Sequence, residues 1–252
     1  MKLFIRSILR KVGLYSLAIT VENKIITLFK KGDRVNFYSQ FVKRGDLVFD
    51  VGANEGNRTD IYLSIGAKVV AVEPQEDCYT KLEKRFGNKI DLIKKGLGEK
   101  EETKTLYISD TNLISSFNAE HIEEMKKDRF KGVNWDKTAD IHLTTLDNLI
   151  AKYGTPDFCK IDVEGFEFDV LKGLSSPLKS LSLEYIVPEN KDVIVNCINH
   201  LNSLGKIECN HSYGESMELG MPNWMEGKAF EEYLKTKEFE ATSYGDVYVR
   251  FI

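Results

Sequence analysis

Short apolar runs alternate with longer amphipathic segments along the chain from residue 47 onward. Most residues of the runs are apolar, which is typical of strands buried on both faces of a parallel sheet. The longer segments between them carry apolar residues at helical spacing. We therefore expect an α/β domain with a doubly wound sheet. The predicted strands are 47–51, 67–74, 90–98, 103–109, 157–164, 180–187, 206–210 and 246–252, and the predicted helices are 57–64, 76–86, 144–154, 167–174, 191–205 and 227–237.

Two segments do not follow this alternation. Residues 1–46 precede the first predicted strand and form an N-terminal helical extension to a predicted domain at 47–252. Within residues 1–20, lysines and arginines recur at helical spacing opposite apolar residues. This helix is expected either to pack on the domain or to contact an anionic membrane surface peripherally. Residues 117–139 are polar and long for a connection, which predicts either an active-site lid or a solvated surface helix.

The charge distribution and the cysteines narrow the class of protein. The 252-residue chain has a net charge of −4, but residues 1–49 hold ten Lys and Arg against three acids, so the rest of the chain carries about −11. Such an acidic remainder argues against a nucleic-acid partner for the main domain. The cysteines form no CxxC pair and no zinc-ligand spacing, which indicates reduced thiols in a cytoplasmic protein. They are Cys78, Cys159, Cys197 and Cys209.

Acidic residues lie at or near the carboxyl ends of four predicted strands. In a doubly wound sheet, ligands bind beyond these ends, at the point where the strand order reverses. A neutral side chain would be easier to desolvate there, so several converging acids indicate a functional site. The acids are Asp50, Glu73, Asp162, Glu164 and Glu184.

The stretch "LVFDVGANEGN" places Gly52, Asn54 and Gly56 directly after the first strand. Glycine lets the backbone turn sharply and approach a ligand closely. Glu73 follows about twenty residues later, where a carboxylate can accept both hydroxyls of a ribose. The turn reads GxNxG instead of GxGxxG, and the acids that flank it disfavour a pyrophosphate. These features favour S-adenosylmethionine, which has a ribose, an ammonium and a sulfonium, over NAD.

Several blocks of the sequence resemble, in order and spacing, the FkbM-type S-adenosylmethionine-dependent methyltransferases. They are "VFDVGANEGNRT", "GAKVVAVEPQEDCYTKL", "TTLDNL", "FCKIDVEGFEFDVLKGL" and the closing "DVYVRF". The most specific block is "KIDVEGFEFDVLKGL". The resemblance implies a Rossmann-like class I methyltransferase fold with seven strands, the last of them antiparallel. It also implies S-adenosyl-L-methionine as cofactor and methyl transfer to a hydroxyl oxygen of a small-molecule or glycan acceptor, often a sugar or a polyketide-like product.

The resemblance further implies roles for individual residues. Glu73 matches the acid that binds the ribose, and Gly96 with Leu97 falls where family members line the adenine. Ser115 and Ser116 resemble a serine pair near the cofactor. The full set of implied cofactor-binding residues is Asp50, Gly52, Asn54, Gly56, Glu73, Gly96, Leu97, Ser115 and Asp162.

Methyl transfer to a hydroxyl calls for a base, because a protonated oxygen is a poor nucleophile. A positioned general base contributes roughly 10²–10⁴-fold to such a reaction. Asp162 and Glu164 match the acidic motif of the family, and either of them or Glu184 can take the proton, with His142 a distant candidate. These three acids could instead hold a divalent cation that lowers the hydroxyl pKa, although we expect no metal.

Two other function classes stay open from the sequence. A nicotinamide-dependent oxidoreductase would share the fold but is disfavoured by the absent GxGxxG. A non-catalytic binding module would keep the fold and lose the chemistry. Glu55, near Arg58, stands where the family more often has an apolar residue. Residues 1–46 and 190–240 lie outside the resemblance, so we expect them to determine the acceptor. The sequence does not set the oligomeric state.

Overall fold

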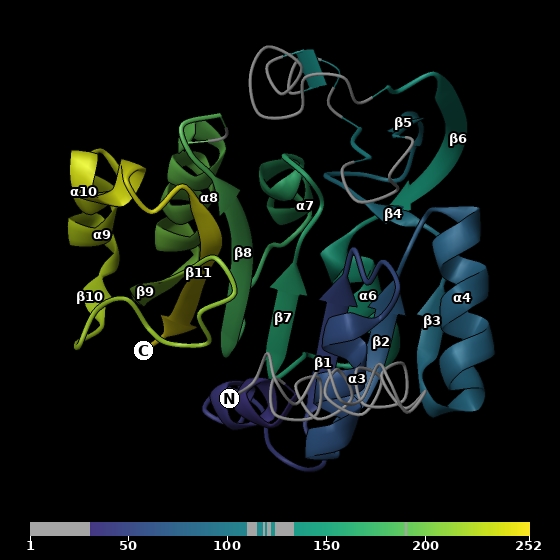
Figure 1. The fold of residues 1–252 in the computed structure, drawn as a ribbon, viewed down its shortest axis with the longest axis horizontal. Helices are drawn as coiled ribbons and strands as arrows, with labels where there is room; N and C mark the ends of the chain where they lie inside the picture. The colour runs from purple at the N-terminus through teal and green to yellow at the C-terminus, as the bar shows by residue number, and fades with distance from the viewer. Residues whose placement is uncertain (1–30, 110–114, 118, 120–121, 124–133, 190) are drawn as a thin grey trace, which may run out of the picture.

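A mixed β-sheet of eight strands runs through the described part of the molecule (Figure 1). The computed structural model describes residues 31–109, 115–117, 119, 122–123, 134–189 and 191–252. Five neighbouring strands, β8 to β3, are parallel, and the C-terminal strand β11 lies antiparallel between two others. The order is β10 (Met225–Glu226), β9 (Ile207–Tyr213), β11 (Tyr244–Phe251), β8 (Ser180–Ile186), β7 (Phe158–Ile161), β1 (Leu47–Val51), β2 (Lys68–Val72) and β3 (Asp91–Ile93).

The α/β fold and the antiparallel last strand are confirmed, but the sheet has one strand more than expected. The additional strand is β10, which pairs with β9 through only two residues, Met225 and Glu226. A two-residue strand is too short to leave a period-two pattern in the sequence.

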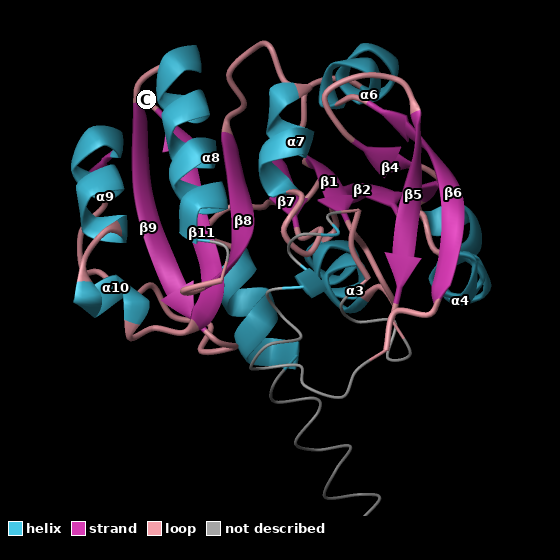
Figure 2. Ribbon diagram, turned by 90° about the horizontal axis from the view of Figure 1, so that it is seen from above, coloured by secondary structure: helices cyan, strands magenta, loops and turns pink. Residues whose placement is uncertain are grey.

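Helices cover both faces of the sheet (Figure 2). Alternate residues of β1 enter two different cores, since successive side chains of a strand point to opposite faces. Phe49 packs with α6 to α9 in one core, whereas Val48 packs with α3, α4 and the helical residues 31–38 in the other. The helices are α3 (Asn57–Ile65), α4 (Glu76–Phe86), η1 (Gly87–Lys89), α6 (Leu146–Tyr153), α7 (Glu167–Lys172), α8 (Lys191–Leu204), α9 (Gly227–Leu234) and α10 (Lys237–Glu240).

A separate three-stranded sheet has the order β4 (Gly96–Leu97), β6 (Lys137–Thr144) and β5 (Thr103–Ile108). The predicted strand at 90–98 is therefore wrong as a single element. Its first part, β3, pairs with β2 in the main sheet, and its second part, β4, pairs with β6. Two lysines interrupt the apolar run between them. Strand β6 was not expected from the sequence, because its first residues belong to the polar stretch 117–139 and are mostly exposed.

Parts of the sequence-based interpretation fall outside the described residues. Residues 1–20, with their predicted membrane contact, are not described, and neither is most of the predicted lid at 117–139. Residues 31–46 of the N-terminal extension do pack on the domain, because Phe37, Tyr38 and Val42 are buried in the second core. Among the described residues, no helix is long and apolar enough to cross a membrane. All four cysteines are buried and free of disulfides.

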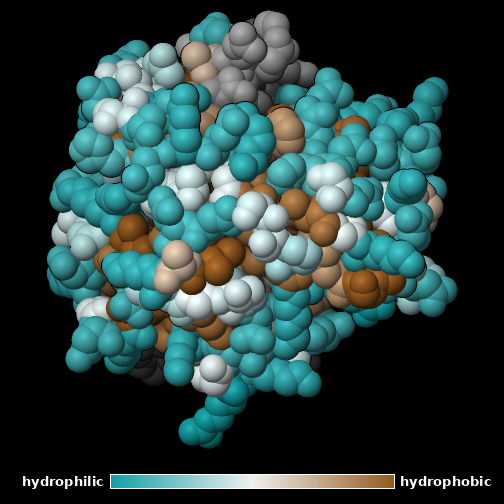
Figure 3. Space-filling view, turned by 180° about the vertical axis from the view of Figure 1, so that it is seen from behind, coloured by the Kyte–Doolittle hydropathy of each residue, from teal (hydrophilic) through white to brown (hydrophobic). Residues whose placement is uncertain are grey.

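On the face shown in Figure 3, most side chains are hydrophilic, and the apolar ones gather in groups across the middle of the view. Within the described residues, the exposed large hydrophobic side chains are Tyr213, Tyr244 and Ile252. Ile252 is the last residue of the chain. The two tyrosines belong to neighbouring strands, since Tyr213 is in register with Gly245. The ring of Tyr244 also packs close to Gly214.

Candidate active site

A cavity of about 490 Å³ opens where β1, β2 and β7 end. Strand β1 lies between β2 and β7. From β1 the strand order runs towards β2 and β3 on one side and towards β7 and β8 on the other, so the order reverses at β1. Ligands bind at such a switch point in doubly wound folds, and the volume lies in the range of small-ligand sites. The lining includes Arg34, Asp50, Gly52, Ala53, Asn54, Glu55, Arg58, Glu73, Gln75, Leu106, Ser115, Phe117, Lys160, Asp162, Glu164, Glu184, Glu215 and Tyr244.

Gly52 and Gly56, the two glycines of the first turn, are required for different steric reasons. Gly52 has φ +80°, and a Cβ there would lie 1.8 Å from the backbone oxygen of Asp162, so the turn needs glycine to pass over the end of β7. Gly56 also has φ +80°, but a Cβ there would meet Leu82 and Phe86 of α4 at 2.7 and 2.4 Å. Gly56 therefore permits close packing of the turn on α4 and is not among the cavity-lining residues.

Glu73 holds the turn in place from the end of β2. Its two carboxylate oxygens accept hydrogen bonds from the backbone N–H groups of Asn54 and Gln75, each at 2.8 Å. Burial raises the pKa of Glu73 to about 7, although these two hydrogen bonds act in the opposite direction. Each oxygen of a carboxylate has a further lone pair. Glu73 can therefore accept two hydroxyl groups from a ligand while it holds the loop.

Asp50 lies beneath the turn and is buried. The hydroxyl of Thr59, in α3, donates a hydrogen bond of 2.5 Å to its carboxylate. Burial raises the pKa of Asp50 to about 6, and the hydrogen bond from Thr59 opposes this shift. The carboxyl group is thereby fixed at the start of the site, where it adds to the acidic character of the cavity.

Three acids meet in the cavity at the ends of β7 and β8. One carboxylate oxygen from each of Asp162, Glu164 and Glu184 lies within 4.8 Å of the others. Burial and the neighbouring carboxylates raise the pKa values of Glu164 and Glu184 well above the usual value. The Oε2 atom of Glu164 is buried without a hydrogen-bond partner. The spacing leaves both predicted roles of these acids available, as a proton acceptor and as ligands of a divalent cation.

The backbone of Glu164 has φ +54°, a conformation uncommon for a residue other than glycine. The hydroxyl of Ser116 donates a 2.7 Å hydrogen bond to the carbonyl oxygen of Glu164. Ser116 also pairs with Tyr107 of β5 through an isolated bridge. The smaller sheet thus supports the turn that presents Glu164 to the cavity.

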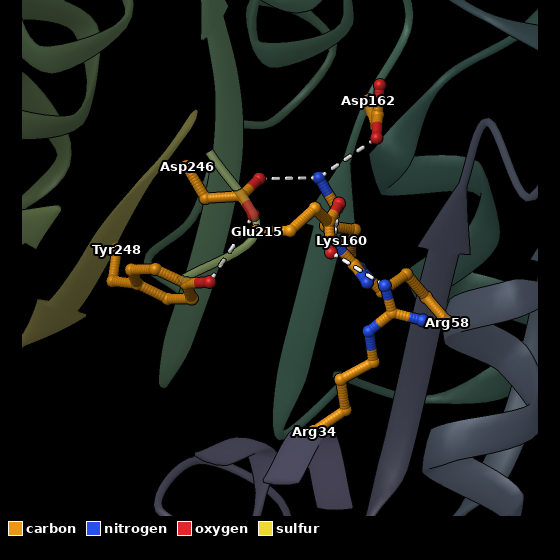
Figure 4. Close-up of polar contacts among 7 residues, drawn as sticks. All are labelled: Arg34, Arg58, Lys160, Asp162, Glu215, Asp246 and Tyr248. Carbon is orange, nitrogen blue, oxygen red and sulfur yellow. Dashed lines mark hydrogen bonds and ion pairs between the residues drawn. The ribbon is translucent and has the colours of Figure 1, made fainter. Parts of the chain in front are cut away.

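A buried lysine, Lys160 of β7, joins Asp162 to Asp246 of β11 (Figure 4). Its Nζ lies 2.6 Å from Asp246 and 3.1 Å from Asp162, and the hydroxyl of Tyr248 donates to Asp246 at 3.3 Å. Burial alone would lower the pKa of Lys160, but the two carboxylates raise it well above its usual value. Burial would raise the pKa of Asp162, but the charge of Lys160 lowers it below the usual value. The pKa values of Asp162 and Glu164 are therefore shifted in opposite directions.

The remaining predicted residues divide between the cavity and its surroundings. Ser115 lines the cavity, and its hydroxyl donates to the side chain of Gln75 at 3.0 Å. Gly96 and Leu97 lie in β4 and are not among the lining residues; a Cβ on Gly96 would meet Leu143 and Phe117. Leu106, Ser115 and Phe117 do line the cavity.

Two other residues singled out in the sequence, His142 and Glu55, have partners outside the group of three acids. His142 is in β6, where its Nδ1 lies 2.9 Å from the hydroxyl of Thr103, and it does not line the cavity. Glu55 forms a 2.6 Å ion pair with Lys81, and its carbonyl oxygen accepts a hydrogen bond from Arg85. Glu55 therefore connects the turn to α4 through these two contacts.

The sequence interpretation missed several lining residues, among them Lys160, Arg34, Glu215 and Tyr244. Lys160 had a visible signal, because a lysine within the apolar strand "FCKI" must find a buried partner. Arg34, Glu215 and Tyr244 had none, since each comes from a different segment and they meet only in the folded chain.

Residues 50–213 match the family model of the methyltransferase FkbM domain. No curated protein matches the sequence. Among solved structures, a putative rRNA methylase from Clostridium thermocellum is 11% identical, with a TM-score of 0.44. The aligned region covers 88% of this chain and 94% of that one. A TehB-like SAM-dependent methyltransferase from Corynebacterium glutamicum is 9% identical, with coverages of 94% and 98% and a TM-score of 0.47. A putative methyltransferase from Streptococcus mutans, in complex with SAH, is 13% identical, with coverages of 86% and 95% and a TM-score of 0.41.

Proposed function

The chain belongs to the FkbM methyltransferase family, and from this premise we propose that it transfers a methyl group from S-adenosylmethionine to a hydroxyl oxygen of a sugar, a glycan or a related small molecule. The observation that carries the proposal is the carboxylate of Glu164, which lines the cavity beside two further acids and has a buried, unpartnered Oε2. An unpartnered carboxylate oxygen in this place is suited to accept a hydroxyl proton.

The residues around the cavity fit the cofactor that the family uses. Glu73 offers two fixed oxygens to the ribose hydroxyls, and Gly52 brings bare backbone to the same wall. Asp50 and Asp162 supply negative charge for the ammonium of the methionine end. When bound, the cofactor supplies an electrophilic methyl group on a sulfonium. Leu106 and Phe117 provide apolar surface beside Ser115 for a flat ring.

Glu164 is the general base in this proposal, for reasons of charge and contact. Asp162 is held ionised by Lys160, and its lowered pKa makes it a weak base. Glu184 has a raised pKa, but its side chain hydrogen-bonds with that of Asp162. Glu164 combines a raised pKa with a free oxygen. A positive charge in the cavity lowers the pKa of Glu164 and so ionises the base when the site is filled.

The acceptor end of the cavity carries Tyr244, one of the exposed aromatic residues of the described chain. An exposed ring at a cavity mouth can pack on the apolar face of a sugar and leave its hydroxyl free to hydrogen-bond. Tyr244 also lies outside the matched residues 50–213, four residues beyond the segment 190–240 that the sequence assigns to acceptor choice. This placement supports a carbohydrate-like acceptor.

The experiment is methyl transfer from labelled cofactor to a panel of sugars and glycans, with the Tyr244→Ala variant beside the wild type. We expect transfer to a hydroxyl and a rise of about tenfold in the acceptor KM of Tyr244→Ala, with the cofactor KM unchanged. Tyr213→Ala is the matched control, because Tyr213 is exposed nearby but does not line the cavity. Equal effects of the two substitutions would remove Tyr244 from acceptor binding. Transfer that stops in excess chelator would assign the three acids to a cation.

A further inference from the structure

Two arginines on the cavity wall share a single carboxylate (Figure 4). The side-chain nitrogen Nη2 of Arg58 lies 2.7 Å from one oxygen of Glu215, and Nη2 of Arg34 lies 3.0 Å from the other. Two guanidinium groups that converge on both oxygens of one carboxylate form the geometry in which arginine binds free carboxylates. All three residues line the same cavity as Glu73 and Asp162.

The two sides of this contact are fixed to different degrees. Arg58 is in the first turn of α3 and its side chain is only 16% exposed, while its guanidinium stacks 5.7 Å from the ring of Tyr38. Glu215 follows β9 in a turn, and its side chain is 52% exposed. Arg58 is therefore held in place by the fold, whereas the carboxylate of Glu215 comes from an exposed surface turn and can move away.

The position of Arg58 also calls for an anion. A helix N-terminus carries a partial positive charge, so a cation in the first turn is electrostatically unfavourable without an anion beside it. Burial would raise the pKa of Glu215, but the two arginines lower it below its usual value, so the carboxylate is ionised. Glu215 thus neutralises a site whose charge favours any carboxylate that enters the cavity.

We propose that Arg34 and Arg58 form a carboxylate-binding subsite, and that Glu215 occupies it as a displaceable latch until a carboxylate of a ligand takes its place. The proposal deepens the proposed function, because the subsite opens into the same cavity. Two ligands can supply the carboxylate: the methionine end of the cofactor, or an acidic acceptor such as a uronic acid. Arg34 and Glu215 lie outside the matched residues 50–213, whereas Arg58 lies within them.

The test is calorimetric titration with S-adenosylhomocysteine and with its analogue that lacks the carboxyl group. If the cofactor supplies the carboxylate, Glu215→Gln tightens binding of S-adenosylhomocysteine about tenfold and leaves the analogue unchanged. Adding Arg34→Gln in the Glu215→Gln background reverses that gain, again without effect on the analogue. Glu218→Gln is the control, since Glu218 is exposed three residues further along the same loop and is not a lining residue.

If the acceptor supplies the carboxylate, the affinity of S-adenosylhomocysteine is the same in the wild type and all variants, and so is that of its analogue. In that case glucuronate binds the S-adenosylhomocysteine-loaded Glu215→Gln protein about tenfold more tightly than it binds the loaded wild type. The proposal is overturned if Glu215→Gln behaves as Glu218→Gln does with both S-adenosylhomocysteine and glucuronate. Methyl transfer to neutral sugars is measured separately, so a failure of the latch leaves the proposed function standing, and a failure of transfer leaves the latch standing.

Discussion

Replacing Glu164 by Gln is expected to lower kcat about 100-fold or more while affinity for S-adenosylhomocysteine stays within about twofold. The substitution keeps the volume of the side chain but removes the group that accepts the proton. The Oε2 atom has no hydrogen-bond partner among the described residues, so the substitution removes its basicity without breaking a hydrogen bond of that atom. Single-turnover rates with saturating acceptor and calorimetry with S-adenosylhomocysteine measure the two quantities.

The pH profile gives an independent readout of the same residue. A raised pKa means that Glu164 is still protonated at pH values where an ordinary glutamate is ionised, and a protonated base cannot accept a proton. The kcat/KM of the wild type, which reports the free enzyme, is therefore expected to rise with pH above the usual titration range of glutamate, and this limb is expected to vanish in Glu164→Gln. Glu184→Gln serves as the comparison. A larger loss of kcat in Glu184→Gln than in Glu164→Gln would transfer the role of base to Glu184.

Replacing Gly52 by Ala is expected to cost on the order of 4 kcal/mol of folding free energy and to abolish cofactor binding. The new Cβ would lie 1.8 Å from the carbonyl oxygen of Asp162 and 2.9 Å from its carbonyl carbon. Both atoms are backbone, so neither can rotate away, and the end of β7 must shift. Chemical denaturation followed by tyrosine and tryptophan fluorescence measures the loss.

Gly45 offers a matched control for this substitution. Its φ of +91° is also left-handed, but a Cβ there would have no neighbour within 4 Å. Gly45→Ala is therefore expected to cost only the conformational strain, about 1 kcal/mol. The difference between the two variants isolates the close approach of the turn to β7. Equal losses in Gly45→Ala and Gly52→Ala would contradict the steric explanation.

The parts of the fold that depend on local pattern could be predicted from the sequence. The helix at 76–86 has the predicted bounds. The helix predicted at 144–154 is found at 146–153, because the Thr145 side chain accepts a hydrogen bond from the N–H of Asn148 at its start and Gly154 ends it. The run at 90–98 was misassigned because apolar content identifies a strand but not its partner. Pairing of β4 with β6 depends on residues more than forty positions apart.

The candidate site shows the same division. The acids of the strand ends could be found because the topology of a doubly wound sheet brings those ends together. The contacts of Arg34 with Glu215 could not, because they join a helix before the first strand to a turn after β9. Glu55 looked anomalous in the sequence only because its partner Lys81 lies on the next helix. Long-range ion pairs leave no periodic signal in a single sequence.

The central claim is that the cavity at the ends of β1, β2 and β7 binds S-adenosylmethionine and that Glu73 holds its ribose. The most direct measurement is a calorimetric titration of the wild type and of Glu73→Ala with S-adenosylhomocysteine and, in parallel, with NAD. We predict micromolar binding of S-adenosylhomocysteine by the wild type, an affinity about 100-fold lower in Glu73→Ala, and no binding of NAD. Binding of NAD in place of S-adenosylhomocysteine, or full affinity in Glu73→Ala, would contradict it.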